Sequence, residues 1–161
     1  MASATKVSPA SVVLDANVVI ALCANEADKV ANADAKVKEY LADGSHFYAP
    51  GVLVAECLYV LCRKLMDGVL TPVEHGAAVQ ALIAMAAAID PPPHGDRSLI
   101  QRAEAIRGTL GCSRSADGIY LALADELAKN STTEILTFDT GMPSQAVAGA
   151  VGAQVVVLPI S

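Results

Sequence analysis

Short, uninterrupted apolar segments alternate along this chain with longer segments in which apolar residues recur at helical spacing. The short segments are rich in β-branched or aromatic residues, which predicts buried strands at 11–14, 46–49, 134–138 and 154–158. The longer segments predict helices at 16–24, 26–43, 52–66, 72–89, 96–110, 143–151, and from a serine at 113 or 115 to about 130. Helices that separate buried strands indicate an α/β fold with a largely parallel sheet.

Local start and stop signals set several of these boundaries. Thr71 is a favoured N-cap residue, and Pro72 suits the first position of the helix that follows. Asp67-Gly68 is a turn signal at the end of the preceding helix. The three prolines of 90–95 cannot propagate a helix, so this segment is expected to be a loop.

Composition places the chain among folded proteins. With 161 residues, 53% of them hydrophobic and 17% charged, we expect one domain over 1–161 that buries about two-thirds of its unfolded surface. No apolar run approaches the roughly 18–20 residues that a membrane span needs, and the N-terminus lacks the apolar stretch of a signal peptide. We therefore expect a cytoplasmic protein that does not associate with a membrane. Its four cysteines are expected to be mainly buried free thiols.

Four acidic residues stand in apolar surroundings, and they are the most informative chemical feature of the sequence. Asp15 and Asp139 each end a predicted strand, Asp117 lies in the first turn of a predicted helix, and Glu56 lies inside an apolar helix. An isolated carboxylate in such surroundings is costly unless it is paired, protonated or bound to a cation. Ligands collect at the carboxyl ends of parallel strands, so the four side chains could converge on one cleft.

Such a cluster would attract divalent cations. Two carboxylates about 5 Å apart repel by roughly 3 kcal/mol at an effective dielectric constant of about 20. Oxygen ligands without histidine or cysteine favour Mg²⁺ or Mn²⁺ over zinc. The chemistry that follows is metal-assisted hydrolysis of a phosphodiester, in which cations bind the phosphate and activate a water.

The net charge of −6 argues only weakly against a nucleic-acid substrate. A general nucleic-acid-binding protein usually has a basic face. Without the four clustered acids, however, 13 acidic groups stand against 11 basic ones, a remainder of −2. A nucleic-acid substrate is therefore not excluded.

Each acid also has a plain structural interpretation. Asp15 or Asn17 could cap the following helix, Asp139 could be a turn residue, and Asp117 could be a favourable charge at a helix N-terminus. Glu56 is the hardest to explain in this way, because an acid in an apolar helix is unfavourable unless it is compensated.

Four further polar residues are candidates for supporting roles. Arg63 and Arg114 each share a helix face with one of the acids and could contact substrate phosphates, or could equally form ion pairs. Ser115 and Thr137 could hydrogen-bond metal-bound water or could satisfy backbone groups. The sequence leaves these alternatives open.

In combination, these segments resemble the PIN-domain nucleases. The resemblance rests on Val-Leu-Asp-Ala-Asn-Val at 13–18, the helical Glu56, Ser-Ala-Asp-Gly-Ile-Tyr-Leu-Ala-Leu-Ala at 115–124 and Leu-Thr-Phe-Asp at 136–139. Their order and separations match along nearly the whole chain. The resemblance implies a three-layer α/β/α fold with a central, mainly parallel sheet.

The resemblance also implies a function. It implies an Mg²⁺- or Mn²⁺-dependent ribonuclease with an RNA substrate, in which Asp15, Glu56, Asp117 and Asp139 bind the metal and Asn17 supports them. Many small bacterial members are VapC-type toxins, which are held inactive by an antitoxin protein and are usually homodimers.

Two other functions remain open at this point. An aspartyl-phosphate phosphatase is suggested by the apolar strand that ends in Asp15, although that class would need a second aspartate where Asn17 stands. A non-catalytic protein-binding module would use the apolar surface of the chain and leave the acids without a role.

Overall fold

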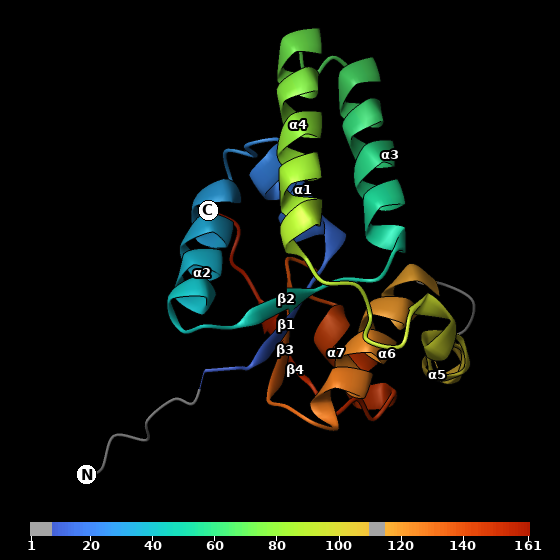
Figure 1. Cartoon of the computed structure of the whole chain (residues 1–161). Helices are drawn as coiled ribbons and strands as arrows, with labels where there is room; N and C mark the ends of the chain where they lie inside the picture. The colour runs from blue at the N-terminus through green and yellow to red at the C-terminus, as the bar shows by residue number, and fades with distance from the viewer. Residues whose placement is uncertain (1–7, 110–114) are drawn as a thin grey trace.

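A parallel β-sheet lies between two layers of helices in the computed structural model, which describes residues 8–109 and 115–161, apart from the side chain of Ser115 (Figure 1). The strands of the described residues are β1 (Ser11–Leu14), β2 (His46–Tyr48), β3 (Thr133–Thr137) and β4 (Gln154–Val157). Their order across the sheet is β2-β1-β3-β4, and every neighbouring pair is parallel. The predicted three-layer α/β/α fold is confirmed.

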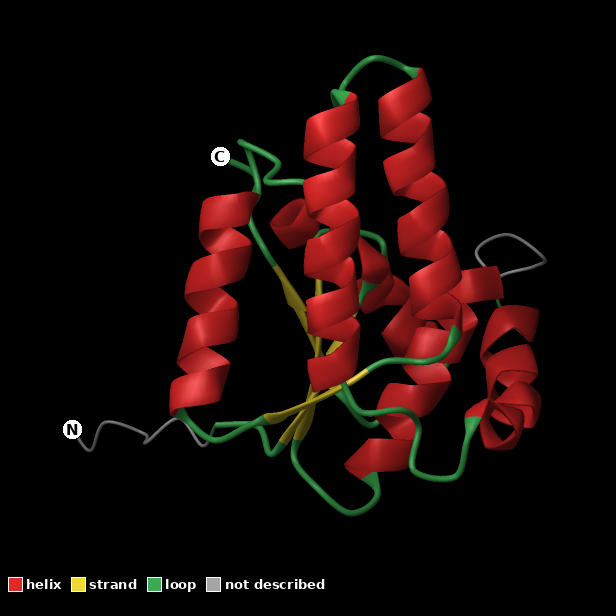
Figure 2. Cartoon of the chain, turned by 45° about the horizontal axis from the view of Figure 1, so that its top comes forward, coloured by secondary structure: helices red, strands yellow, loops and turns green. Residues whose placement is uncertain are grey.

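Seven helices occur within the described residues, and they divide between the two faces of the sheet (Figures 1 and 2). On one side, α1 packs against α2, α3 and α4, and on the other α6 packs against β1, β3 and α5 while α7 contacts β4. The helices are α1 (Ala16–Cys23), α2 (Val30–Ala42), α3 (Val52–Met66), α4 (Pro72–Ala88), α5 (Asp96–Gly108), α6 (Ser115–Ala128) and α7 (Met142–Ala148). In both views α3 and α4 project together from the body of the molecule.

The two central strands are buried from both sides, which explains their unbroken apolar sequences. Val12, Val13, Ile135 and Leu136 are fully enclosed between α1 and α6. Because β1 and β3 are parallel neighbours with Leu14 opposite Leu136, their carboxyl ends meet at the same edge of the sheet. This pairing brings together two segments that are about 120 positions apart in the sequence.

Helix boundaries differ from the predictions mainly at turns. The helix expected over 26–43 begins only at Val30, since Asn25 has a positive φ of 52° and residues 27–29 form turns. The last helix ends at Ala148, ahead of Ala150 with a φ of 50°. At the start of α4 the Thr71 side chain and the N3 glutamate form a reciprocal capping box, so the predicted cap is confirmed.

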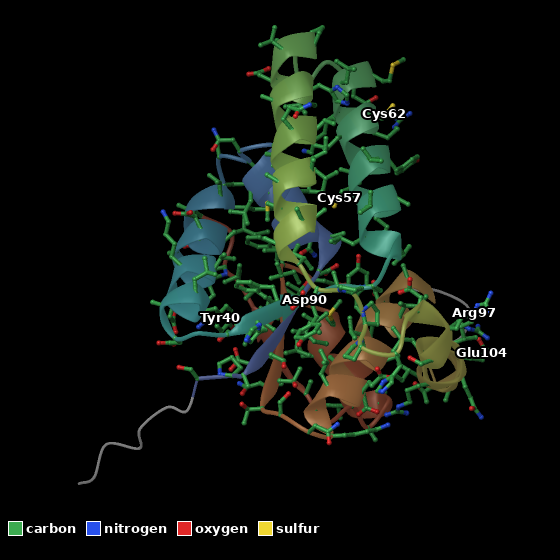
Figure 3. All side chains as sticks on the ribbon, in the orientation of Figure 1. Tyr40, Cys57, Cys62, Asp90, Arg97 and Glu104 are labelled. Carbon is green, nitrogen blue, oxygen red and sulfur yellow. The ribbon has the colours of Figure 1, made fainter. Side chains whose placement is uncertain are left out.

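The cysteines are only partly as predicted. Cys23 and Cys57 are buried free thiols, whereas Cys62 is exposed on the outer side of α3, so the prediction of burial is wrong there (Figure 3). Cys112 lies outside the described residues. None of the described helices is both long and apolar enough to cross a membrane.

Candidate active site

The four acidic residues singled out from the sequence line a single open cleft of about 320 Å³. They reach it from different elements: the end of β1, the middle of α3, the first turn of α6 and the turn after β3. The lining consists of Asp15, Ala16, Asn17, Ile20, Glu56, Tyr59, Val60, Asp117 and Asp139. Strand ends and helix faces far apart in the sequence are thus combined at one edge of the sheet.

Asp15 is held by two neutral hydrogen-bond donors, one at the end of β3 and one at the start of α1. Its Oδ2 atom accepts from the Thr137 hydroxyl at 2.6 Å and from Asn17 Nδ2 at 2.8 Å. Although Asp15 occupies the N-cap position of α1, its side chain makes no capping hydrogen bond. The capping interpretation therefore does not explain why this aspartate is buried, with only 8% of the residue exposed.

Asn17 and Thr137 connect the start of α1 to the end of β3. Asn17 Oδ1 accepts a hydrogen bond from the backbone N–H of Phe138 at 3.1 Å, while its Nδ2 donates to Thr137 Oγ1 at 3.1 Å. Thr137 Oγ1 also accepts from the backbone N–H of Asp139 at 2.9 Å. These bonds fix the spacing between the two strand ends from which Asp15 and Asp139 project.

The other three acids are also oriented by hydrogen bonds from neutral donors. The Tyr120 hydroxyl donates to Glu56 Oε2 at 2.6 Å, and Gln145 Nε2 donates to Asp117 Oδ2 at 3.0 Å. Asp139 Oδ1 accepts from a backbone N–H two residues further on, at 2.7 Å. In all four carboxylates one oxygen is held by a neutral donor, which sets the direction of the other oxygen.

Burial and mutual repulsion act on the acids of the cleft. Burial raises the pKa of Asp15 from 3.8 to about 6; the Thr137 hydrogen bond opposes this rise, and the charges of Asp117 and Glu56 add to it. The pKa of Tyr120 is raised by burial and by its bond to Glu56, so its phenol remains a donor. A site with these properties favours a cation or a proton near Asp15.

The donor chemistry of the cleft fits a hard divalent cation. Carboxylate oxygens are the ligands that Mg²⁺ and Mn²⁺ prefer. Over the described residues, however, no group of three or more His, Cys, Asp or Glu side chains is arranged so that it could hold a metal ion. The acids share a cleft and an electrostatic field, and they do not form a closed chelating cage.

The supporting residues predicted at 63, 114 and 115 are not among the residues described at the cleft. Arg63 does not line the cleft and pairs with Asp67 at 3.2 Å. Arg114 and the side chain of Ser115 lie outside the described residues. Tyr120 and Gln145 were not predicted as site residues, although the position of Tyr120, one helical turn after Asp117, places it on the same face of α6.

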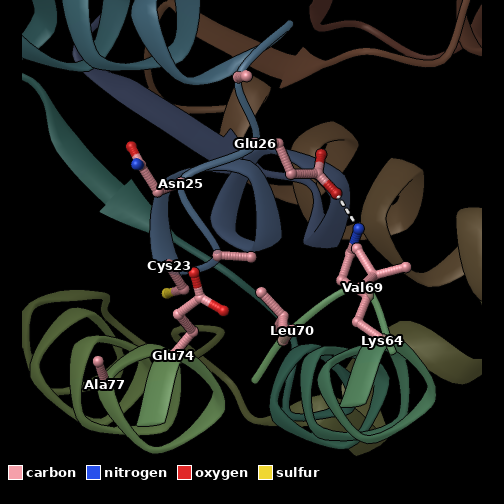
Figure 4. Close-up of a pocket in the computed structure, with 10 residues that line it drawn as sticks. Cys23, Asn25, Glu26, Lys64, Val69, Leu70, Glu74 and Ala77 are labelled. Atoms are coloured by element: carbon pink, nitrogen blue, oxygen red, sulfur yellow. Dashed lines mark ion pairs between the residues drawn. The ribbon is translucent and has the colours of Figure 1, made fainter. Parts of the chain in front are cut away.

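A cavity of about 370 Å³ at the end of α1 is distinct from the acidic cleft (Figure 4). Within it, Glu26 forms an ion pair with Lys64 at 2.6 Å, and Lys29 also contacts Glu26 at 3.0 Å. Burial acts to raise the pKa of Glu26, but the hydrogen bonds and charges of the two lysines outweigh it and hold the pKa below its ordinary value. This compensated carboxylate ties the turn after α1 to the end of α3.

Comparison with models of known protein families identifies a match that covers most of the chain. The model of a family described as PIN domain matches residues 12–147, a range that contains all four acids of the cleft. No curated protein matches the chain.

Proposed function

Since the chain belongs to the PIN-domain family, whose members are typically nucleases, we propose that it is a metal-dependent endoribonuclease. The observation that supports this most directly is the convergence of Asp15, Glu56, Asp117 and Asp139 on one cleft. These four residues would supply carboxylate ligands to Mg²⁺ or Mn²⁺, and because no three of them are arranged to hold an ion on their own in the described structure, waters and substrate phosphate would complete the coordination. The chemistry that such a cation supplies when bound is neutralisation of phosphate charge and a lower pKa for water at the site.

The protein's own contribution is orientation and proton placement. Asp15 Oδ2 is occupied by Thr137 and Asn17, so a proton on this carboxylate would reside on Oδ1. With its pKa raised to about 6 in the metal-free protein, Asp15 can take up a proton near neutral pH, and a cation that binds this carboxylate would displace that proton. Tyr120 and the other neutral donors keep the remaining carboxylates in fixed directions without neutralising them.

The test is cleavage of a structured RNA pool by the wild type and by Asp117→Asn, each with Mn²⁺, Mg²⁺ or EDTA. We expect cutting by the wild type only, with metal, and no cutting in EDTA. Asp34→Asn is a matched control, because Asp34 is an exposed helical aspartate paired with Lys38. Equal cutting by wild type and Asp117→Asn would indicate a contaminating nuclease and would contradict the proposal.

Metal binding has an independent readout. A cation that binds only the folded chain raises its melting temperature by mass action. We expect Mn²⁺ to raise the melting temperature of the wild type and to raise that of Asp117→Asn less. The absence of any shift together with the absence of cutting would favour a non-catalytic binding module instead.

For the biological role we propose a VapC-type toxin that forms a homodimer and is inhibited by an antitoxin protein. Exposed apolar side chains on the α3–α4 pair support a protein partner there, among them Leu58, Met66, Val73 and Ile83. Growth arrest on expression of the wild type, and not of Asp117→Asn, would support the toxin role, and sedimentation would give the oligomeric state. The free thiols suit the reducing cytoplasm, which is the location we propose.

An aspartyl-phosphate phosphatase is less compatible with the site. That reaction needs a nucleophilic carboxylate oxygen and a second acid close by. Here Asn17 takes the second position and donates to Asp15, so the position is filled by an amide donor.

A further inference from the structure

The exposed aromatic surface of this protein is concentrated in one side chain. All six aromatic residues of the sequence lie in the described part of the chain. Tyr59 is 67% exposed, whereas Tyr48 is partly buried and the other four are at most 8% exposed, namely Tyr40, Phe47, Tyr120 and Phe138. Packing in the core therefore explains most of the aromatic rings, but it does not explain the ring of Tyr59.

Tyr59 is both exposed to solvent and part of the lining of the acidic cleft. It lines the cleft together with Glu56 and Val60, and these three follow one another at positions i, i+3 and i+4 of α3. Residues at this spacing share a helix face, with Cβ atoms about 5–6 Å apart. Arg63, at i+7, continues the same face one turn further along the helix.

The charge of the chain makes an aromatic contact more important. Phosphate neutralisation by lysine and arginine usually supplies much of the affinity for RNA. This chain has 11 basic residues against 17 acidic ones. An unpaired base can instead stack on an aromatic ring, a contact that tolerates any base and is absent when the base is paired within a duplex.

We propose that Tyr59 is a substrate-positioning residue whose ring stacks on an unpaired base next to the phosphate held at the acidic cleft. This inference rests on the proposed ribonuclease function. The guanidinium of Arg63 lies further along the same face, and its pair with Asp67 is weak because both side chains are more than half exposed. Arg63 can exchange that partner for the following phosphate.

The test measures binding separately from cleavage. In an Asp117→Asn background with Mn²⁺, a single-stranded RNA that contains 2-aminopurine reports stacking by fluorescence quenching. The chain has no Trp, so the probe can be excited without protein interference. We expect Tyr59→Leu to weaken binding about tenfold and abolish quenching, because the stacked ring is lost, and Tyr59→Phe to retain both, because phenylalanine keeps the ring.

Leucine keeps the apolar character and removes the ring, so it separates stacking from general hydrophobic contact. Leu58→Ala is the matched control, since Leu58 is the neighbouring exposed apolar residue and does not line the cleft. We expect it to bind RNA like its parent. Duplex RNA of the same sequence should bind Tyr59→Leu and its parent equally.

The outcomes distinguish this proposal from the proposed function. Unchanged affinity and quenching in Tyr59→Leu would overturn the role of Tyr59 even if the wild type cuts RNA. Binding with ring-dependent quenching, but without cleavage by the wild type in any metal, would support Tyr59 and overturn the ribonuclease. Loss of self-association in both Tyr59→Leu and Leu58→Ala, with RNA affinity unchanged, would assign the ring to a protein interface and overturn the proposal.

Discussion

Replacing Asp15 by asparagine should make the metal-free protein more stable at neutral pH. Asp15 is almost fully buried, and burial together with the charges of Asp117 and Glu56 raises its pKa to about 6. Asparagine has the same shape and can still accept the hydrogen bonds of Thr137 and Asn17 through its carbonyl oxygen. It carries no charge into the cleft.

The magnitude follows from proton linkage. In the unfolded chain Asp15 has its ordinary pKa of 3.8, so between pH 3.8 and about 6 the native state binds more protons than the unfolded state. The free energy of unfolding of the wild type therefore falls as the pH rises through this interval. At 1.36 kcal/mol per pH unit, the full loss above pH 6 is about 3 kcal/mol, and Asp15→Asn should not suffer it.

The assay is urea denaturation in EDTA, followed by circular dichroism, at several pH values between about 3.5 and 7.5. The stability difference between Asp15→Asn and wild type should be near zero at the acidic end and reach about 3 kcal/mol at the neutral end. Asp34→Asn, at an exposed ion pair, should change stability by less than about 1 kcal/mol. A variant that is no more stable than wild type at neutral pH, or a gain that does not vary with pH, would refute the reasoning.

Three further substitutions test other contacts. Thr137→Val removes a hydroxyl donor to Asp15 and should lower stability by about 1–3 kcal/mol and reduce cleavage, whereas Thr137→Ser should retain both in denaturation and RNA-cleavage assays. Tyr120→Phe removes the donor to Glu56, and we expect weaker stabilisation by Mn²⁺ in thermal melts, with little change in secondary structure by circular dichroism. Thr71→Ala breaks the capping box of α4 and should lower the free energy of unfolding by about 1 kcal/mol with RNA cleavage unchanged.

The parts of the site that were predictable from sequence are those that depend on the sheet. Asp15 and Asp139 follow apolar strands, and parallel strands bring their carboxyl ends to one edge. The position of Glu56 beside the strand ends was harder to predict from the sequence, because it depends on how α3 packs against α1. In that packing the Cys57 thiol contacts the carbonyl of Ala16 at 3.9 Å. The packing of α3 against α1 is a property of the assembled core rather than of either helix alone.

The partners of the acids were the least predictable. Tyr120 carries an apolar ring in an apolar helix, and only the folded structure shows that its hydroxyl reaches Glu56 on α3. Gln145 lies in a seven-residue helix whose start and end the sequence indicated only approximately. Its contact with Asp117 joins α7 to α6, and no pattern in the sequence indicates that these two helices meet. Hydrogen-bond partners of this kind follow from tertiary geometry.

The pairing of β1 with β3 has a consequence for synthesis of the chain. The hydrogen bond between Thr137 and Asp15 joins residues 122 positions apart, so the acidic cleft is incomplete until both strands are present in the sheet. A chain emerging from the ribosome has its first strand long before the third, and during that time it has no assembled site. If the site cuts RNA, the messenger from which the chain is translated therefore stays protected from it until the residues of β3 have been synthesised and paired with β1.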